Sequence, residues 1–78
     1  MSCQPVASKS DFRVILGTAI RKYRQRAGFS QEELAEKAGL HRNYFGRVER
    51  GEENIKMVPL RRIAKALGVR VRVLVWNI

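Results

Sequence analysis

Three polar residues near the middle of the chain have the chemistry needed to recognise nucleobases. Arg42, Asn43 and Arg47 fall at spacings that place them on one outer face of an α-helix. A guanidinium pairs bidentately with O6 and N7 of guanine, and a carboxamide pairs in the same way with N6 and N7 of adenine. We therefore expect these residues to read base edges in the major groove of double-stranded DNA. A solvated charged helix face is the alternative that they leave open.

A second group of residues can hold phosphates or touch other parts of a groove. Gln31 opens a predicted helix, where unpaired backbone N–H groups and the positive end of the helix dipole favour a phosphate oxygen. His41 can cap the helix that follows it, touch a phosphate, or be an ordinary surface residue. Tyr44 can pack on a thymine methyl group, and Gly46 can let the helix lie close to the groove floor. The predicted phosphate or groove contacts are Gln31, Ser30, His41, Tyr44, Gly46, Arg50, Asn54 and Lys56.

The charge of the whole chain favours an anionic partner. The 78 residues include 16 Lys and Arg against 7 Asp and Glu, which gives a formal net charge of +9. This balance is the electrostatic footprint of a nucleic-acid-binding domain, although an anionic membrane surface or an acidic protein also attracts it. A chain of this length forms one domain with a small core.

Catalysis, a metal site, a cofactor and a small-molecule ligand are not expected. No candidate nucleophile has a base beside it, and His41 is the only histidine, so no metal-binding cluster is present in the sequence. The single cysteine, Cys3, cannot form an internal disulfide, and the chain start lacks the apolar region of a signal peptide. Because no apolar run is long enough to span a membrane, we expect a cytoplasmic protein without a membrane partner.

Apolar periodicity predicts a series of helices. The first begins near Phe12, after a flexible arm over residues 1–9, with Ser10 as its N-cap and Gly28 as its stop. Further helices are predicted over residues 31–38, 42–50 and 57–67. The apolar face of the first helix is formed by Phe12, Ile15, Leu16, Ala19, Ile20, Tyr23 and Ala27.

The second and third helices are predicted to form a tightly joined pair. Ser30 and Glu33 have the spacing of a capping box, and Gly39 permits the left-handed turn between the helices. Ala35 is small enough for the helices to cross closely. The predicted core of the pair is Leu34, Leu40, Phe45 and Val48. This is a helix-turn-helix arrangement over residues 31–50, whose second helix is free to enter a major groove.

The end of the chain is compatible with two structures. Valines alternate with other residues from Val69 to Val75, which is typical of a strand. A lone strand of this length has no partner, however. The apolar residues here, together with Trp76 and Ile78, favour either a surface for a second copy or a cap on the protein's own core.

Three stretches of the chain resemble a known family. Residues 28–40, 48–52 and 63–69 read GFSQEELAEKAGL, VERGE and IAKALGV. They resemble the lambda-repressor/Cro family, or XRE type, of bacterial and phage regulators, and the resemblance extends over about residues 16–74. The compact size and residues 39–54 are also similar to the controller proteins of restriction-modification systems.

This resemblance implies an all-α, compact five-helix DNA-binding domain over residues 10–78, with the helix-turn-helix at residues 31–50. It places a fifth helix near residues 70–75, inside a dimerisation segment over about residues 69–78. It makes Arg24 and Glu49 a partly buried ion pair that braces the motif. The dimer contacts it implies are Val71, Leu74, Val75 and Trp76.

The resemblance also implies a function. Arg42, Asn43 and Arg47 would read bases and Gln31 would contact a phosphate. The protein would be a homodimeric transcriptional regulator on a pseudo-palindromic operator, in a bacterial cytoplasm or nucleoid or encoded by a phage. The alternative is an antitoxin or bridging module whose main ligand is another protein.

Overall fold

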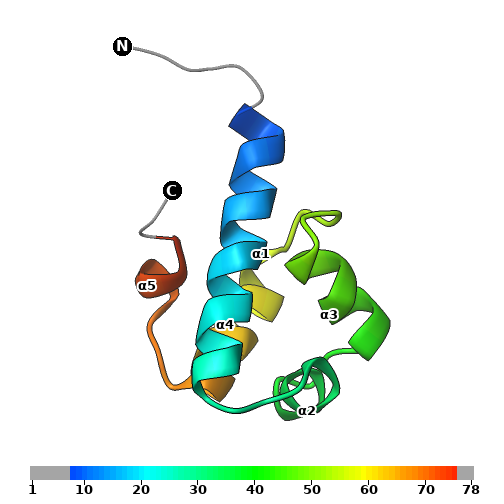
Figure 1. Ribbon diagram of the computed structural model, residues 1–78, viewed down its shortest axis with the longest axis vertical. Helices are drawn as coiled ribbons and strands as arrows, with labels where there is room; N and C mark the ends of the chain where they lie inside the picture. The colour runs from blue at the N-terminus through cyan, green and yellow to red at the C-terminus, as the bar shows by residue number, and fades with distance from the viewer. Residues whose placement is uncertain (1–7, 76–78) are drawn as a thin grey trace.

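A computed structural model describes the backbone of residues 8–75 and the side chains of residues 12–75. Within this range it contains five helices: α1 (Ser8–Arg26), α2 (Gln31–Lys37), α3 (Arg42–Glu49), α4 (Met57–Leu67) and α5 (Val71–Val75). The predicted all-α, five-helix fold is confirmed. In Figure 1, α1 runs along the molecule with α2 and α3 on one side, α5 on the other and α4 behind. None of these helices is long and apolar enough to cross a membrane.

All five helices contribute to one apolar core. Its buried members are Leu16, Ile20, Leu34, Ala35, Ala38, Phe45, Val48, Leu60, Ile63, Ala64 and Leu74. The predicted core of the helix pair is confirmed, because Leu34, Phe45 and Val48 are buried and Leu40 packs half-buried against them. Since α2 and α3 are too short to be stable alone, this shared core is what keeps them helical.

The first helix ends before Gly28 as predicted, but it differs from its prediction in its first residue and in the burial of two side chains. It begins at Ser8, so Ser10 lies inside the helix and the prediction of Ser10 as N-cap was wrong. Serine costs little inside a helix, and nothing at this position stops the helix from extending toward the N-terminus. Phe12 and Ala27, placed on the buried face by their spacing, are exposed. The reason for Phe12 is that the first turns of α1 extend beyond the other helices (Figure 1). Residues 1–7 of the predicted arm lie outside the described residues.

The beginning of α2 has the predicted capping box. The Ser30 hydroxyl oxygen accepts from the Glu33 backbone N–H at 3.0 Å, and the Glu33 carboxylate accepts from the Ser30 N–H at 2.8 Å. Two of the N–H groups that a helix start leaves without helical partners are thereby satisfied. The helix is then ended by Gly39, whose φ of 71° is the left-handed conformation expected of the turn.

The C-terminal segment is a helix and not a strand. Val71, Leu74 and Val75 recur at helical spacing, and Leu74 is fully buried in the core while the two valines pack partly buried against it. The alternation of valines was therefore a misleading signal. Among the described residues no strand is present to pair with this segment, whereas the helix satisfies its own backbone and places Leu74 in the core.

Two glycines that the sequence analysis did not single out bring α1 and α3 together. A Cβ added at Gly17 of α1 would lie 2.5 Å from the carbonyl oxygen of Glu49 and 2.6 Å from that of Val48. Gly51, which follows α3 with a φ of 76°, has Val14 of α1 at 2.8 Å from the position its Cβ would take. The C-terminal end of α3 therefore packs directly on the backbone of α1, and this contact sets the direction in which α3 points.

Candidate nucleic-acid interface

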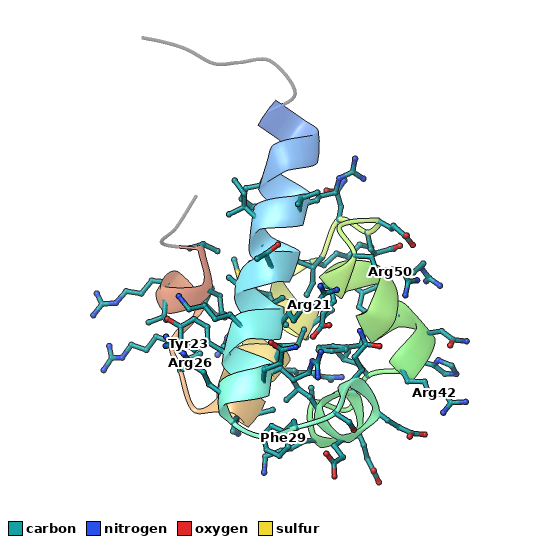
Figure 2. All side chains as sticks on the ribbon, viewed as in Figure 1. Arg21, Tyr23, Arg26, Phe29, Arg42 and Arg50 are labelled. Atoms are coloured by element: carbon teal, nitrogen blue, oxygen red, sulfur yellow. The ribbon has the colours of Figure 1, made fainter. Side chains whose placement is uncertain are left out.

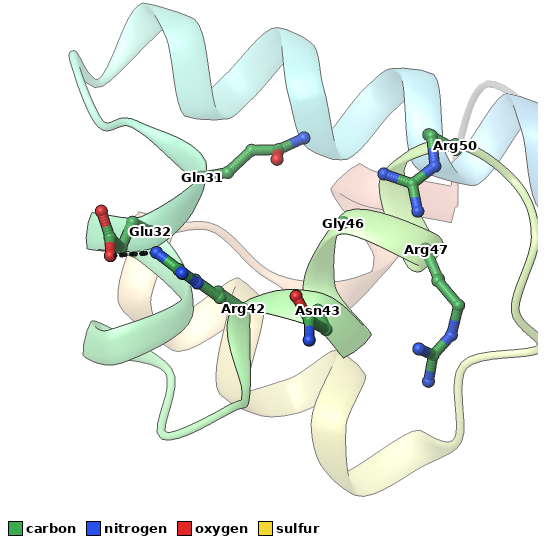
Figure 3. A pocket seen from close by; sticks show the side chains of 7 residues that line it. All are labelled: Gln31, Glu32, Arg42, Asn43, Gly46, Arg47 and Arg50. Atoms are coloured by element: carbon green, nitrogen blue, oxygen red, sulfur yellow. Dashed lines mark hydrogen bonds and ion pairs between the residues drawn. The ribbon is translucent and has the colours of Figure 1, made fainter.

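The outer side of α3 forms an open pocket with the start of α2. The pocket, of about 520 Å³, is lined by Gln31, Glu32, Arg42, Asn43, Gly46, Arg47 and Arg50, and we call it the α3 pocket. Figure 3 shows these residues around it. The three residues predicted to read bases are thus brought together with Gln31, Gly46 and Arg50. Their common location is the basis for treating this surface as a nucleic-acid interface.

The three predicted base readers are exposed, and both arginines have carboxylate partners. Arg42 Nη1 lies 2.6 Å from Glu32 Oε2 of α2, and Arg47 Nε lies 3.2 Å from Glu53 Oε1 in the loop after α3. Figure 2 shows Arg42 extending outward from α3. Asn43 is exposed beside them. Exposed ion pairs contribute only about 0–1 kcal/mol, so these contacts add little to the stability of the fold.

Arg50 lies at the other end of the pocket and has the same kind of partner. Its Nε and Nη2 atoms contact the Glu52 carboxylate at 3.1 and 3.3 Å. Its Nη1 atom lies 3.2 Å from the position that a Cβ on Gly46 would occupy. Gly46 is consequently buried beneath the Arg50 side chain, even though it lies on the outer side of the helix as predicted.

Behind the exposed surface, a buried carboxylate joins three helices. The Glu49 side chain of α3 is fully buried, and its Oε2 accepts from Arg24 Nε of α1 at 2.5 Å. Its Oε1 accepts from Arg24 Nη2 at 3.2 Å and from Gln31 Nε2 of α2 at 2.8 Å. Arg21 of α1 points toward α3 in Figure 2, and its Nε lies 3.6 Å from Glu49 Oε1. The predicted ion pair of Arg24 and Glu49 is confirmed, and its other contacts make it a junction of α1, α2 and α3.

Arg24 also stabilises the turn between α1 and α2. Its Nη1 atom donates to the backbone carbonyl of Phe29 at 2.9 Å, so one guanidinium satisfies both a buried carboxylate and a loop carbonyl. A buried charge needs several such partners to offset its loss of hydration. Because these contacts fix α2 and α3 relative to α1, they also fix the shape of the α3 pocket.

Gln31 and Ser30 each make a structural hydrogen bond in addition to the phosphate contact predicted for them. The Gln31 amide nitrogen, predicted to contact a phosphate, already donates to Glu49, which leaves the second of its two N–H groups for another partner. The Ser30 hydroxyl already accepts the capping bond from Glu33. Both side chains therefore position α2 whether or not DNA is bound.

His41 lies where the sequence predicted it, whereas Tyr44 does not. His41 is the N-cap of α3, because its Nδ1 accepts from the Asn43 backbone N–H at 3.1 Å; the capping alternative is confirmed. Tyr44 was expected on the outer face, but it is half-buried and packs against the core. It lies four residues before Val48, on the side of α3 that faces the other helices, so its predicted place on the outer face was wrong, whereas its groove contact stays a prediction.

The remaining predicted contacts lie outside the pocket. Asn54 and Lys56 are exposed between α3 and α4. In α5, Val71 and Val75 are half-buried, whereas the fully buried Leu74 has no surface left for a second copy, so its assignment to a dimer contact was wrong. Trp76 lies outside the described residues.

Comparison with known proteins identifies the family. Residues 20–74 match the helix-turn-helix family model HTH_3. The chain belongs to this XRE/Cro-type family of DNA-binding transcriptional regulators. It is 48% identical over 61 residues to the control protein C.SmaI of Serratia marcescens, which covers 78% of this chain and 73% of that protein. It is 37% identical over 62 residues to the control protein C.BamHI of Bacillus amyloliquefaciens, with 78% and 76% coverage.

Solved structures agree with this assignment. The restriction-modification controller protein C.AhdI from Aeromonas hydrophila superposes with a TM-score of 0.78 at 39% identity, over 88% of this chain and 98% of that one. The biofilm regulator SinR in complex with DNA gives a TM-score of 0.73 at 37% identity, over 76% and 95%. The predicted family resemblance is confirmed. The family consists of transcriptional regulators and not of enzymes, which agrees with the prediction that this chain is not an enzyme.

Proposed function

We propose that this member of the helix-turn-helix family is a homodimeric, sequence-specific regulator that reads a pseudo-palindromic operator through the major groove. The observation that carries the proposal is the α3 pocket, where Arg42, Asn43 and Arg47 are exposed around one surface. An α-helix fits the major groove of B-DNA, and these side chains are the types that discriminate guanine and adenine there.

Base readout is assigned to Arg42, Asn43 and Arg47, and the surrounding residues supply phosphate contacts. The residues proposed for the phosphates are Gln31, Ser30, His41, Arg50, Asn54 and Lys56. Gln31 uses its second N–H group, and His41 uses Nε2, because Nδ1 accepts the capping bond. The net charge of +9 adds attraction to any duplex, and this part of the affinity falls steeply with salt.

A dimer through the α5 region fits this arrangement. Val58, Val69 and Val71 line a hollow between α4 and α5, and Val58 and Met57 are exposed. The same hollow is also lined by Ala64 and by the basic residues Arg61, Arg62 and Lys65. Because α3 and α5 lie on opposite sides of α1 (Figure 1), a second copy docked at α5 leaves both α3 helices uncovered. Two such helices can enter successive major grooves about 34 Å apart. We assign Val71 and Val75 to this contact.

The relatives suggest the biological setting. C.SmaI and C.BamHI are named control proteins, and C.AhdI is described as a restriction-modification controller protein. We extend this role to the present chain, which would regulate restriction and modification genes from an operator near their promoters.

Selection of binding sites from random duplexes at near-physiological salt tests the proposal. We expect enrichment of an inverted repeat whose half-sites are about one helical turn apart. Sedimentation of the complex should give two protein chains per duplex. Salt-sensitive binding without enrichment would contradict sequence-specific readout and would favour the antitoxin or bridging module. An enriched single half-site, bound by one chain, would contradict the dimer alone.

A further inference from the structure

The two arginines at the C-terminal half of α3 contact their carboxylates through different edges. A guanidinium has two bidentate edges, the side edge of Nε with one Nη atom and the end edge of the two Nη atoms. Glu52 occupies the whole side edge of Arg50, with contacts at 3.1 and 3.3 Å. Glu53 contacts only Nε of Arg47, at 3.2 Å. In Figure 3 the two Nη atoms of Arg47 form the outer end of its side chain.

The fold holds Glu53 beside Arg47. After α3, the Gly51 N–H donates to the Val48 carbonyl at 3.1 Å and the Glu52 N–H donates to the Arg47 carbonyl at 2.9 Å. This pair of bonds around a left-handed glycine is a Schellman motif, which sets the direction of the chain that follows. The Glu53 side chain is only 35% exposed, so it is more restricted than the carboxylates that project freely into water.

We propose that Glu53 is a positioning residue that holds Arg47 so that its end edge faces a guanine. The proposal rests on the proposed function, in which Arg47 reads a base. A long side chain loses rotamer freedom when it docks, and holding it in place beforehand reduces that loss. It also disfavours arginine rotamers that would reach a neighbouring base or phosphate, so the carboxylate contributes to selectivity as well as to affinity.

A carboxylate beside a DNA-contacting arginine can also act in the opposite sense, as a competitor. Any duplex then has to displace the carboxylate from the arginine. Removing the carboxylate by mutation therefore raises the affinity for all DNA sequences. Glu52 is expected to act in this way, because it occupies the bidentate edge of Arg50. Glu52 is therefore a useful control: it is adjacent in the chain and carries the same charge, but its side chain is more exposed, at 53% against 35% for Glu53.

The test compares Glu53→Ala with Glu52→Ala on the selected operator and on duplexes substituted at the base that Arg47 reads. For Glu53→Ala we expect discrimination at that base to fall by about 2- to 10-fold, the value of one immobilised side chain. Glu53→Gln keeps an acceptor oxygen and should recover part of the loss. For Glu52→Ala we expect affinity for every duplex to rise by up to about 5-fold, with base preference unchanged. Thermal melting in the absence of DNA should be nearly the same for all variants.

Arg47→Ala separates this proposal from the one on which it rests. If that variant retains full base preference, Arg47 does not read a base, and the proposed readout fails together with the role of Glu53. If Arg47→Ala relaxes preference at one base but Glu53→Ala leaves it unchanged, or raises affinity uniformly as Glu52→Ala does, only the positioning role is overturned.

Discussion

The protein uses the same pair of chemical groups, a guanidinium and a carboxylate, in two very different environments. The Glu49 side chain is fully buried and the side chain of its partner Arg24 is 12% exposed. Glu32 in the α3 pocket is 69% exposed and its partner Arg42 is 64% exposed. In the interior, no water can replace a lost partner, so the pair must remain intact. At the surface, water and salt compete with the pair, so it can exchange for DNA.

The buried ion pair and the exposed ion pairs therefore have different roles. The Glu49 junction keeps α3 at a fixed angle to α1 and α2, and so determines where Arg42, Asn43 and Arg47 lie. The exposed pairs contribute little to that framework. We expect Glu52 to compete with DNA for Arg50, whereas the role proposed for Glu53 is to position Arg47. A rigid support beneath exchangeable side chains is a suitable arrangement for reading a sequence.

The largest effect is expected from breaking the buried junction. Arg24→Ala leaves Glu49 with the Gln31 amide and the half-exposed Arg21 at 3.6 Å, and should lower the free energy of unfolding by about 3–5 kcal/mol. Urea denaturation followed by circular dichroism measures this loss. Glu36→Ala, at an exposed charged residue of α2, serves as the control and should change stability by less than about 0.5 kcal/mol. A loss below about 1 kcal/mol for Arg24→Ala would mean that the buried carboxylate does not depend on it.

The close approach of α1 and α3 should be the next most sensitive feature. Gly17→Ala places a Cβ against two backbone carbonyl groups of α3, so we expect destabilisation of about 1–3 kcal/mol although alanine favours the helix. Operator affinity should fall as well, because α3 has to shift. Thr18→Ala, an exposed neighbour in the same helix, is the control for unfolding measurements. A stabilised Gly17→Ala variant would show that the two helices separate freely.

The N-cap of α2 lies between the two regions, since α2 supplies Gln31 to the buried junction and Glu32 to the surface. Ser30→Ala removes the capping oxygen and should cost about 1 kcal/mol, whereas Ser30→Asp retains a cap and should cost little. Thermal unfolding of the two variants measures the difference. Equal stability of both would contradict the capping role. A loss of operator affinity in Ser30→Ala that exceeds its loss of stability would support an additional phosphate contact.

The smallest effect is expected at the exposed pair of Arg42 and Glu32. A double-mutant cycle with Glu32→Gln and Arg42→Gln should give a coupling energy of about 0.2–1 kcal/mol that shrinks as salt is raised. Unfolding free energies of the four proteins measure it. A salt-independent coupling above about 2 kcal/mol would remove the distinction between this pair and the buried junction.

Much of the fold was predictable because its signals are local. The capping box of Ser30 and Glu33, the turn at Gly39 and the apolar spacing in α3 each depend on residues only a few positions apart. The bounds predicted for α4 were those observed. The family resemblance added the fifth helix and the pairing of Arg24 with Glu49, which join distant parts of the chain and which periodicity alone does not reveal.

The sequence by itself determined where α2, α3 and α4 lie, that the chain is strongly basic, and which arginines and asparagine lie on the outer side of α3. Only the tertiary structure decided that Leu74 belongs to the core, that Tyr44 faces inward and that Gly17 touches the backbone of α3. It also decided which carboxylates Arg42, Arg47 and Arg50 contact. The physical reason is that helix formation depends mainly on neighbouring residues, whereas burial and ion pairing depend on how elements distant in sequence pack together.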